Sequence, residues 1–393
     1  MKGDNRVRGD NPPVSHDRRV LTPAYVLSEQ TLKTSLDAFC RISRETGCRI
    51  LFALKSSSVV AALEMMRGRV HGFSASSPFE ARLGREVIGG DGTIHLTAPG
   101  LKEDAIPVIN EVCDYLSFNS LSQWERLARR VSAKVTCGLR VNPQISFVKD
   151  LRYDPCRSHS KLGEPLPALL RAIDRHGGSL PRIEGIHFHT NCDSTDYGQL
   201  LRTVRTIERS LGPLLTHLTW VNLGGGYLLE NARNFDALYE ALAMLQSGYG
   251  LTLFLEPGSA IIREAVSLVT TVTDLFHRDG KAIAILDTTV NHMPEIFEYQ
   301  FRPVIRGEEQ TGEFPYTLAG ATCLAGDLFG EFRFGEPLEI GTRLVFEHMG
   351  SYTLAKAHMF NSMNMPSIYR VGPRGAMKLV KHFDYADFLA HWR

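Results

Sequence analysis

The stretch RILFALKS, residues 49–56, is a short apolar run that ends on a lysine, Lys55. Apolar runs of this length are typical of strands covered on both faces, as in parallel sheets flanked by helices. A lysine at the end of such a strand has two interpretations. Either Lys55 marks the point where the strand reaches solvent, or its amine is partly desolvated and acts as a nucleophile near neutral pH. The rest of the chain has to decide between them.

The same pattern recurs along the chain: an apolar run, a polar or glycine-containing end, and then an amphipathic helix. The runs are 49–56, 70–77, 93–100, 114–120, 134–143, 182–190, 220–226 and 252–258. Eight strand-then-helix units in succession predict an α/β chain with a parallel (β/α)8 TIM barrel, since open sheets of this class usually have fewer strands. In such a barrel the chemistry lies at the C-terminal ends of the strands, which is where Lys55 stands.

After about residue 264 the pattern changes to shorter alternating segments bounded by Gly, Pro and Asp. These segments predict a C-terminal antiparallel β domain, which the short β-like segment just before the barrel is expected to join. The predicted organisation is a disordered tail at 1–20, a barrel at 21–264 and a β domain at 265–393.

Composition limits the class of partner. The chain has 393 residues, a net charge of +1 and a hydrophobic content of 43%, all ordinary for a globular protein. This charge attracts neither nucleic acid nor anionic lipid, and no apolar stretch approaches the roughly 18 residues of a membrane span. Seven cysteines without a CxxC pair fit neither a disulfide framework nor a zinc site. We therefore expect a cytoplasmic protein with a small-molecule substrate, no nucleic acid, no membrane and no metal.

Two glycine-containing motifs end the last two runs. NLGGGY carries Gly224, Gly225 and Gly226, and LEPG carries Glu256 and Gly258. Glycine lets the backbone approach a ligand closely and present N–H groups to an anion. Barrel phosphate sites are commonly built from the loops after strands seven and eight. Each motif alone also fits an ordinary turn, but together they predict a phosphate site beside a carboxylate.

Lys55 and these two motifs match one cofactor, pyridoxal 5′-phosphate (PLP). The aldehyde of PLP needs a lysine. Its ring nitrogen needs a charged partner, and its phosphate needs a set of N–H donors. Glu256 at the ring nitrogen favours the protonated ring, into which electrons flow when a bond at the substrate's α-carbon breaks. His189, at the end of the sixth run, is placed to lie flat against the ring. Lys55 is thus predicted to be the cofactor lysine.

In combination, these motifs resemble the fold-type III PLP enzymes, the alanine racemase-like barrel decarboxylases, over residues 22–371. The family's lysine, stacking histidine, glycine loop and ring-nitrogen carboxylate match the residues assigned above. Its cysteine, which reaches the active site from the neighbouring subunit, matches Cys323 in GATCLAGD. Its phosphate-binding tyrosine matches Tyr352 in GSYT. The resemblance implies an alanine racemase-like fold and a homodimer with composite active sites.

Within the family, the chain most resembles the carboxynorspermidine decarboxylases. The resemblance lies in YDPCRSHSKLG, LDTTVNHMPEIFEYQFRP, TCLAGD and FNSMNMPSIY. Leu324 replaces an acidic residue of the ornithine and diaminopimelate enzymes, which favours a different substrate. The chain departs from the subfamily at Lys161, where an arginine is usual, and at Asn191-Cys192-Asp193, where a Cys-Glu pair is usual. The resemblance implies decarboxylation of carboxynorspermidine or carboxyspermidine to norspermidine or spermidine and CO2.

A carboxylated polyamine has one α-carboxylate to lose and a cationic tail that needs acceptors. Asp287, Glu298 and Asp327 are the candidate acceptors, and each fits an ordinary solvated carboxylate equally well. After CO2 leaves, the α-carbon needs a proton, which Cys323 can give if its thiol lies close.

Other functions remain open at this point. The nearest is decarboxylation of another basic or diamino acid, such as diaminopimelate, an ornithine-like substrate or a natural-product intermediate. Racemisation is disfavoured because alanine racemase places an arginine, not a carboxylate such as Glu256, at the ring nitrogen. An inactive regulatory homologue is a function of another class, disfavoured by the full set of site residues.

Overall fold

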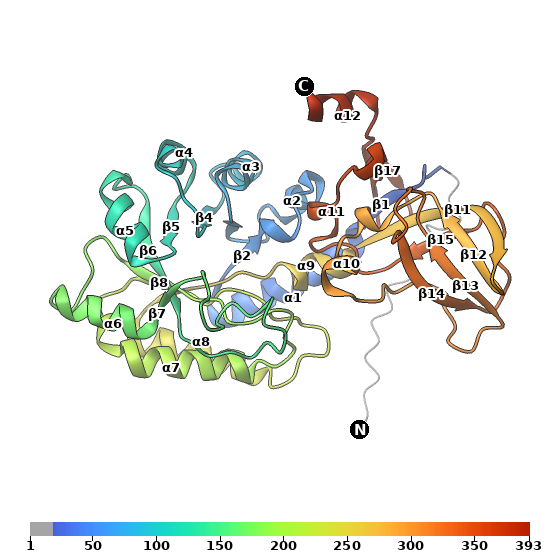
Figure 1. The fold of residues 1–393 in the computed structure, drawn as a ribbon. Coiled ribbons are helices and arrows are strands. Elements are labelled where there is room, and N and C mark those ends of the chain that lie inside the picture. The colour runs from blue at the N-terminus through green and yellow to red at the C-terminus, as the bar shows by residue number, and fades with distance from the viewer. Residues whose placement is uncertain (1–18) are drawn as a thin grey trace. The chain divides into compact units, whose positions relative to one another are not determined.

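The computed structural model describes residues 19–393, which form two compact units (Figure 1). One unit is Ser35–Ile261, and the other joins Ile262–Arg393 to the described residues up to Thr34. The prediction of a disordered tail falls, for residues 1–18, outside the described residues. Val20 is fully buried.

The larger unit, hereafter the barrel unit, is a closed barrel of parallel strands. Its strands are β2 (Arg49–Ala53), β3 (Gly72–Ala75), β4 (Thr93–Thr97), β5 (Tyr115–Phe118), β6 (Thr136–Asn142), β8 (Gly185–His187), β9 (Trp220–Asn222) and β10 (Thr252–Leu255). They pair in the order β5-β4-β3-β2-β10-β9-β8-β6, and the pairing of β5 with β6 closes the circle. A two-residue strand, β7 (Glu164–Pro165), pairs with the far end of β6. Each strand falls in one of the eight predicted runs, so the predicted barrel is confirmed.

Helices follow the strands and lie outside them in Figure 1. They are α1 (Glu29–Thr46), α2 (Val60–Met66), α3 (Pro78–Ile88), α4 (Ile106–Val112), α5 (Leu121–Leu127), α6 (Leu166–Arg175), α7 (Gly198–Leu215), α8 (Asp236–Tyr249) and α9 (Ser259–Ile262). Serines cap two of them: the Ser77 and Ser120 hydroxyls accept N–H bonds from Glu80 and Gln123. These caps fix where α3 and α5 begin, directly after β3 and β5.

A hydrophobic cluster around Trp220 joins three strands of the barrel. Trp220 packs with Leu51 and Phe254, and a side chain at Gly138 or Gly185 would collide with its indole ring. A Cβ at Gly185 would lie 2.1 Å from that ring. The two glycines therefore make room for one large side chain, as close packing of a barrel core requires.

The second unit, hereafter the sheet unit, is built on one mixed sheet. Its strands are β1 (Ala24–Ser28), β11 (Val266–Arg278), β12 (Lys281–Leu286), β13 (Phe314–Ala319), β14 (Leu328–Phe334), β15 (Arg343–Phe346), β16 (Ser367–Val371) and β17 (Met377–Lys381). The order is β14-β13-β12-β11-β1-β16-β17, with β15 paired to β11. The segment just before the barrel forms β1 and belongs to this sheet, as expected. Most pairs are antiparallel as predicted, but β1–β16 and β12–β13 are parallel.

Short helices complete the sheet unit: α10 (Glu295–Tyr299), α11 (Thr353–Lys356) and α12 (Tyr385–Trp392). Its core includes Tyr25, Phe332 and Phe346, all 1% exposed or less. Among the described residues, the structure has no helix with the length and apolarity needed to cross a membrane.

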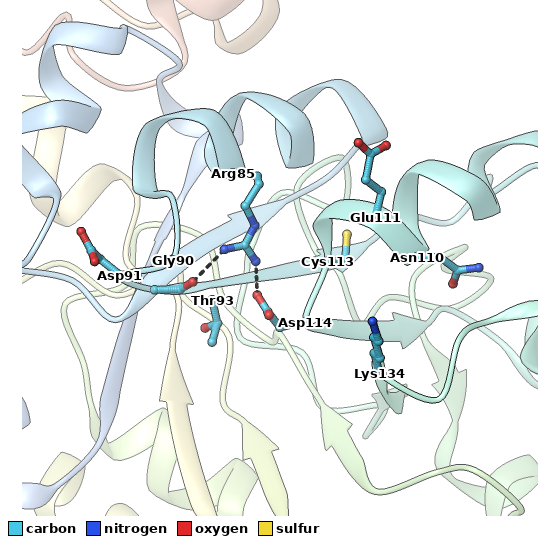
Figure 2. Close-up of a pocket in the computed structure, with 10 residues that line it drawn as sticks. Arg85, Gly90, Asp91, Thr93, Asn110, Glu111, Cys113, Asp114 and Lys134 are labelled. Atoms are coloured by element: carbon cyan, nitrogen blue, oxygen red, sulfur yellow. Dashed lines mark hydrogen bonds and ion pairs between the residues drawn. The ribbon is translucent and has the colours of Figure 1, made fainter.

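A pocket lies at the N-terminal ends of β4, β5 and β6 (Figure 2). Arg85 lines this pocket. Its guanidinium donates hydrogen bonds to the Asp114 carboxylate and to the backbone oxygens of Gly89, Gly92 and Val112. These bonds tie the end of α3 to the starts of two strands. The arrangement is that of a structural clamp, at the opposite end of the strands from the predicted chemistry.

Candidate active site

Lys55 follows β2 directly, in the single turn η2 (Leu54–Ser56). The residues on either side of it are buried, whereas its own side chain is exposed to solvent. Desolvation by the protein around the amine is nevertheless the main cause that lowers the pKa of Lys55. Glu256 opposes the shift and Arg140 adds to it. The amine therefore loses its proton more readily than an ordinary lysine does, as a nucleophile requires.

Glu256 follows β10 and is 7% exposed. Its Oε1 accepts a hydrogen bond from Asn222 Nδ2 at 2.7 Å, and His187 Nε2 lies 3.7 Å from its Oε2. Burial acts to raise the pKa of this carboxyl, but His187, Lys55 and the hydrogen bonds from Asn222 and Ser74 outweigh it and hold the pKa low. The site thus keeps a charged carboxylate in a buried position.

The three glycines lie between two neighbouring loops. A Cβ at Gly225 would come within 2.1 Å of the Glu256 carbonyl oxygen, and one at Gly226 within 2.2 Å of the Asn191 oxygen. Gly224 and Gly226 also have φ of +68° and +86°, which favour glycine. Any side chain here would push the loops after β8 and β10 away from the loop after β9.

Two of the three glycine N–H groups donate within the protein. Gly224 N bonds Asn222 Oδ1 at 2.9 Å, and Gly225 N bonds His189 Nδ1 at 3.1 Å. Of these three glycines, Gly226 is therefore the one whose N–H we expect to face an anion. The bond from Gly225 also orients His189, because it makes Nδ1 the acceptor and leaves Nε2 to carry the proton of the neutral ring. Burial, reinforced by Lys55 and Arg140, holds the pKa of His189 well below its usual value.

The barrel unit therefore contains Lys55, His189, the glycine loop and Glu256 at the C-terminal ends of its strands. Gly258 packs there too, since a Cβ on it would lie 2.9 Å from Ser56 Oγ. Sequence reasoning missed Asn222, which joins the glycine loop to Glu256. The available signal was a polar residue in the otherwise apolar WVNL, directly before the glycines.

Cys323 and Tyr352 belong to the sheet unit. Cys323 is exposed in the connection between β13 and β14. Tyr352 precedes α11 with φ +67°, and the Lys356 ammonium lies 5.6 Å from its ring centroid. A positive φ on a bulky residue is unusual and marks a constrained position.

Asp327, a predicted substrate acceptor, is 2% exposed and fully engaged inside the sheet unit. Its Oδ1 accepts from Thr289 Oγ1 and Val290 N, and its Oδ2 accepts from the N–H and hydroxyl of Thr322. Four hydrogen bonds occupy the acceptor positions of a carboxylate. This geometry favours a structural role for Asp327.

Asp287 and Glu298, the other two predicted acceptors, differ from each other. Asp287 accepts from the hydroxyls of Thr22 and Thr270, both at 2.6 Å, and from Thr271 N. Glu298 has a 43% exposed side chain and forms an ion pair with Lys356. A second cation can therefore exchange with Lys356 at Glu298 more easily than it can enter the Asp287 cluster.

The sequence profile of the family described as pyridoxal-dependent decarboxylase, C-terminal sheet domain, matches residues 24–350. The chain belongs to the pyridoxal-dependent decarboxylase family. It is accordingly a PLP-dependent carboxy-lyase, as predicted.

Relatives of this family match nearly the whole chain. Carboxyaminopropylagmatine decarboxylase of Synechocystis sp. is 36% identical over 388 residues, 96% of this chain and 96% of that protein. Carboxynorspermidine/carboxyspermidine decarboxylase of Herminiimonas arsenicoxydans is 31% identical over 373 residues, 94% and 99% of the two chains. The crystal structure of carboxynorspermidine decarboxylase complexed with norspermidine, from Campylobacter jejuni, has a TM-score of 0.86 at 28% identity and covers 95% of this chain and 100% of that one. The family and fold predicted from the sequence are confirmed.

The barrel site fits the family's cofactor. Lys55 offers an amine of lowered pKa for the aldehyde, and Glu256 offers a buried charged carboxylate for the ring nitrogen. The glycine loop excludes side chains from the place where a phosphate would meet backbone. These are the three chemical demands of PLP on a protein.

Proposed function

We propose that this enzyme decarboxylates a carboxylated polyamine, carboxynorspermidine or carboxyspermidine, to norspermidine or spermidine and CO2. The observation that carries the proposal is that Lys55 and the buried carboxylate of Glu256 follow β2 and β10, which are paired neighbours in the barrel. The similarity to relatives of this activity over nearly the whole chain supports the choice of substrate.

We propose the following roles in the barrel unit. PLP, when bound, supplies an aldehyde that joins the substrate's amine and a ring that takes up the electrons left when the carboxylate departs. Lys55 holds the aldehyde through its amine, and Glu256 holds a proton at the ring nitrogen. His189 flanks the ring in the orientation set by Gly225. The N–H groups of Gly226 and Gly258 bind the phosphate, because backbone N–H groups in turns form concave anion-binding sites.

Two residues of the sheet unit also have roles in this proposal. Tyr352 binds the phosphate, and the thiol of Cys323 from the neighbouring subunit gives a proton to the α-carbon after CO2 has left. Exposure of Cys323 within its own chain is compatible with this role. The enzyme then works as a cytoplasmic homodimer with two composite active sites. The predicted domain boundary at residues 264–265, with the residues just before the barrel joined to the β domain, is part of this proposal.

Glu298 is the acceptor that we propose for the cationic tail. Its exposed carboxylate already binds one ammonium, that of Lys356, so a polyamine ammonium meets a suitable partner there. We assign Asp287 and Asp327 a structural role in the sheet unit, because hydroxyl and N–H groups of that unit already donate to their carboxylate oxygens.

A second candidate substrate is carboxyaminopropylagmatine, favoured by the relative that is 36% identical over 388 residues. It carries the same amino-acid end but ends in a guanidinium instead of an ammonium. A guanidinium is planar and binds a carboxylate through two parallel hydrogen bonds, which an ammonium cannot do. The departures at Lys161 and Asn191-Cys192-Asp193 are consistent with a tail different from that of the carboxynorspermidine enzymes.

Two measurements test this proposal. The purified protein should absorb in the visible when PLP is bound, and borohydride should fix the cofactor on the peptide that contains Lys55. A label on another lysine would overturn the cofactor assignment, and no cofactor binding at all would favour an inactive regulatory homologue.

Release of CO2 across a substrate panel then identifies the tail. The panel is carboxynorspermidine, carboxyspermidine, carboxyaminopropylagmatine, diaminopimelate and ornithine, with Lys55→Ala as the inactive control. The largest kcat/KM should fall on one of the first two. A maximum on the agmatine derivative would establish the second candidate, and one on diaminopimelate or ornithine would refute both.

A further inference from the structure

His187 is the last residue of β8 and is 2% exposed. Neither of its ring nitrogens has a hydrogen-bond partner among the described residues. A buried polar atom without a partner is costly, so its persistence calls for an explanation. Nε2 lies 3.7 Å from Oε2 of Glu256, just beyond hydrogen-bond length.

The other oxygen of the same carboxylate is already fixed. Asn222 Nδ2 donates to Oε1 at 2.7 Å, and Asn222 is itself held by the N–H of Gly224. His187 and Asn222 thus approach the two oxygens of Glu256 from two adjacent strands, β8 and β9. A movement of about 0.8 Å would bring the His187 contact to an ordinary length of about 2.9 Å.

Nearby histidines have partners of their own. His189 accepts from Gly225 N, and His95 lies 3.0 Å from the Thr93 hydroxyl. Among the described residues, Glu256 is the carboxylate that lies within 4 Å of a His187 ring nitrogen. The histidine is therefore directed at the carboxylate and not at the surrounding core.

We propose that His187 is a positioning residue: its neutral ring donates a hydrogen bond to Oε2 of Glu256 and, with Asn222, holds that carboxylate charged and in one orientation toward the cofactor's ring nitrogen. The proposal rests on the role proposed above for Glu256.

Neutrality of the ring is what makes this arrangement useful. Burial lowers the pKa of His187 to about 4, although Glu256 acts in the opposite direction. A neutral donor stabilises the carboxylate without a full positive charge beside it. The negative charge of Glu256 then remains available to the ring nitrogen.

The test compares amides of two lengths. The amide nitrogen of Gln occupies approximately the place of His Nε2, and that of Asn the place of Nδ1. His187→Gln should keep the cofactor's dissociation constant within about threefold of wild type, whereas His187→Asn and His187→Phe should weaken it by about tenfold or more. His292→Phe changes a buried histidine of the sheet unit that lies 3.0 Å from the Thr288 hydroxyl, and this matched control should stay within about twofold. Cofactor titration of the apo chain, followed by absorbance, gives these constants, and thermal unfolding verifies the fold.

A double-mutant cycle then isolates the contact. In a Glu256→Gln background, His187→Phe should change the dissociation constant by less than about twofold, because the carboxylate it supports is gone. Equal effects of His187→Phe in both backgrounds would overturn the proposal, as would equal constants for the Gln and Asn variants. If Glu256→Gln itself changes neither the absorbance nor the affinity, the role of Glu256 fails, and that failure is distinguishable from failure of the His187 contact alone.

Discussion

Replacement of Asn222 by leucine isolates the link between the glycine loop and Glu256. Leucine has the same number and branching of side-chain heavy atoms, so the change removes hydrogen bonds without opening a cavity. Two bonds are lost, one to the carboxylate of Glu256 at 2.7 Å and one from Gly224 N at 2.9 Å. Asn222 is 2% exposed and Glu256 7%, so water cannot replace them easily. Each buried group left unpaired costs about 1–3 kcal/mol, with more for a charge, giving a loss of about 3–5 kcal/mol.

Thermal unfolding of the protein without cofactor measures this loss. For domains of about 150–250 residues, 1 kcal/mol shifts Tm by about 2–4 °C. Asn222→Leu should therefore lower the Tm of the barrel transition by at least about 6 °C. It should also weaken PLP binding, since both the glycine loop and Glu256 lose their support.

Asn110→Leu is the matched control. Asn110 also makes two hydrogen bonds, to Arg130 O at 3.2 Å and from Ser132 N at 2.8 Å, but it is half-buried in the pocket of Figure 2. Water can reach its partners, so we expect a loss near 1 kcal/mol, or about 2–4 °C. Equal Tm losses in the two variants, or a loss below about 2 °C for Asn222→Leu, would refute the argument from buried hydrogen bonds.

Three further predictions address assembly, substrate binding and pH. Mixing Lys55→Ala and Cys323→Ala proteins should restore about a quarter of wild-type activity, because each heterodimer keeps one intact site; mixtures that exchange subunits but stay inactive would exclude composite sites. Glu298→Gln should raise KM for the polyamine by about tenfold and change kcat little, and an unchanged KM in steady-state kinetics would remove Glu298 from the tail site. His348 pairs with Glu264 at 2.6 Å, and this bond raises the His348 pKa above its ordinary value of 6.5. Because the folded pKa is the higher one, the ion pair stabilises the fold below about pH 6.5, and this stabilisation is lost as pH rises through the folded pKa. The Tm difference between wild type and His348→Gln should therefore shrink as pH rises. A Tm difference independent of pH would contradict the pairing.

Local patterns explain how far sequence reasoning reached. Each strand of the barrel is a short apolar run with its own polar end, and each helix carries its own apolar face, so every unit can be recognised from neighbouring residues. Closure of the barrel follows from the number of units. Lys55 and Glu256 could be assigned because strand ends converge in this fold, which converts a position in the sequence into a place in space.

Predictions that depended on distant partners were less complete. Asp327 looks like an available carboxylate in the sequence, but Thr289, Val290 and Thr322 surround it in the folded sheet unit. The sheet itself was expected to be antiparallel, yet β1 pairs in parallel with β16, more than 300 residues away. Alternation along a strand fixes which face is buried but does not determine the direction of its neighbour.

The sequence alone determined the (β/α)8 barrel, its second β domain and the PLP chemistry, and it predicted the site residues at the strand ends, because periodicity and short motifs are properties of adjacent residues. Only the tertiary structure decided what surrounds those residues. It bonded Asn222 to one oxygen of Glu256, brought His187 to 3.7 Å from the other, and oriented His189 through the N–H of Gly225. Such contacts join segments that are 34 to 69 residues apart in the chain, and a hydrogen bond within about 3 Å depends on how whole strands pack, which no local pattern records.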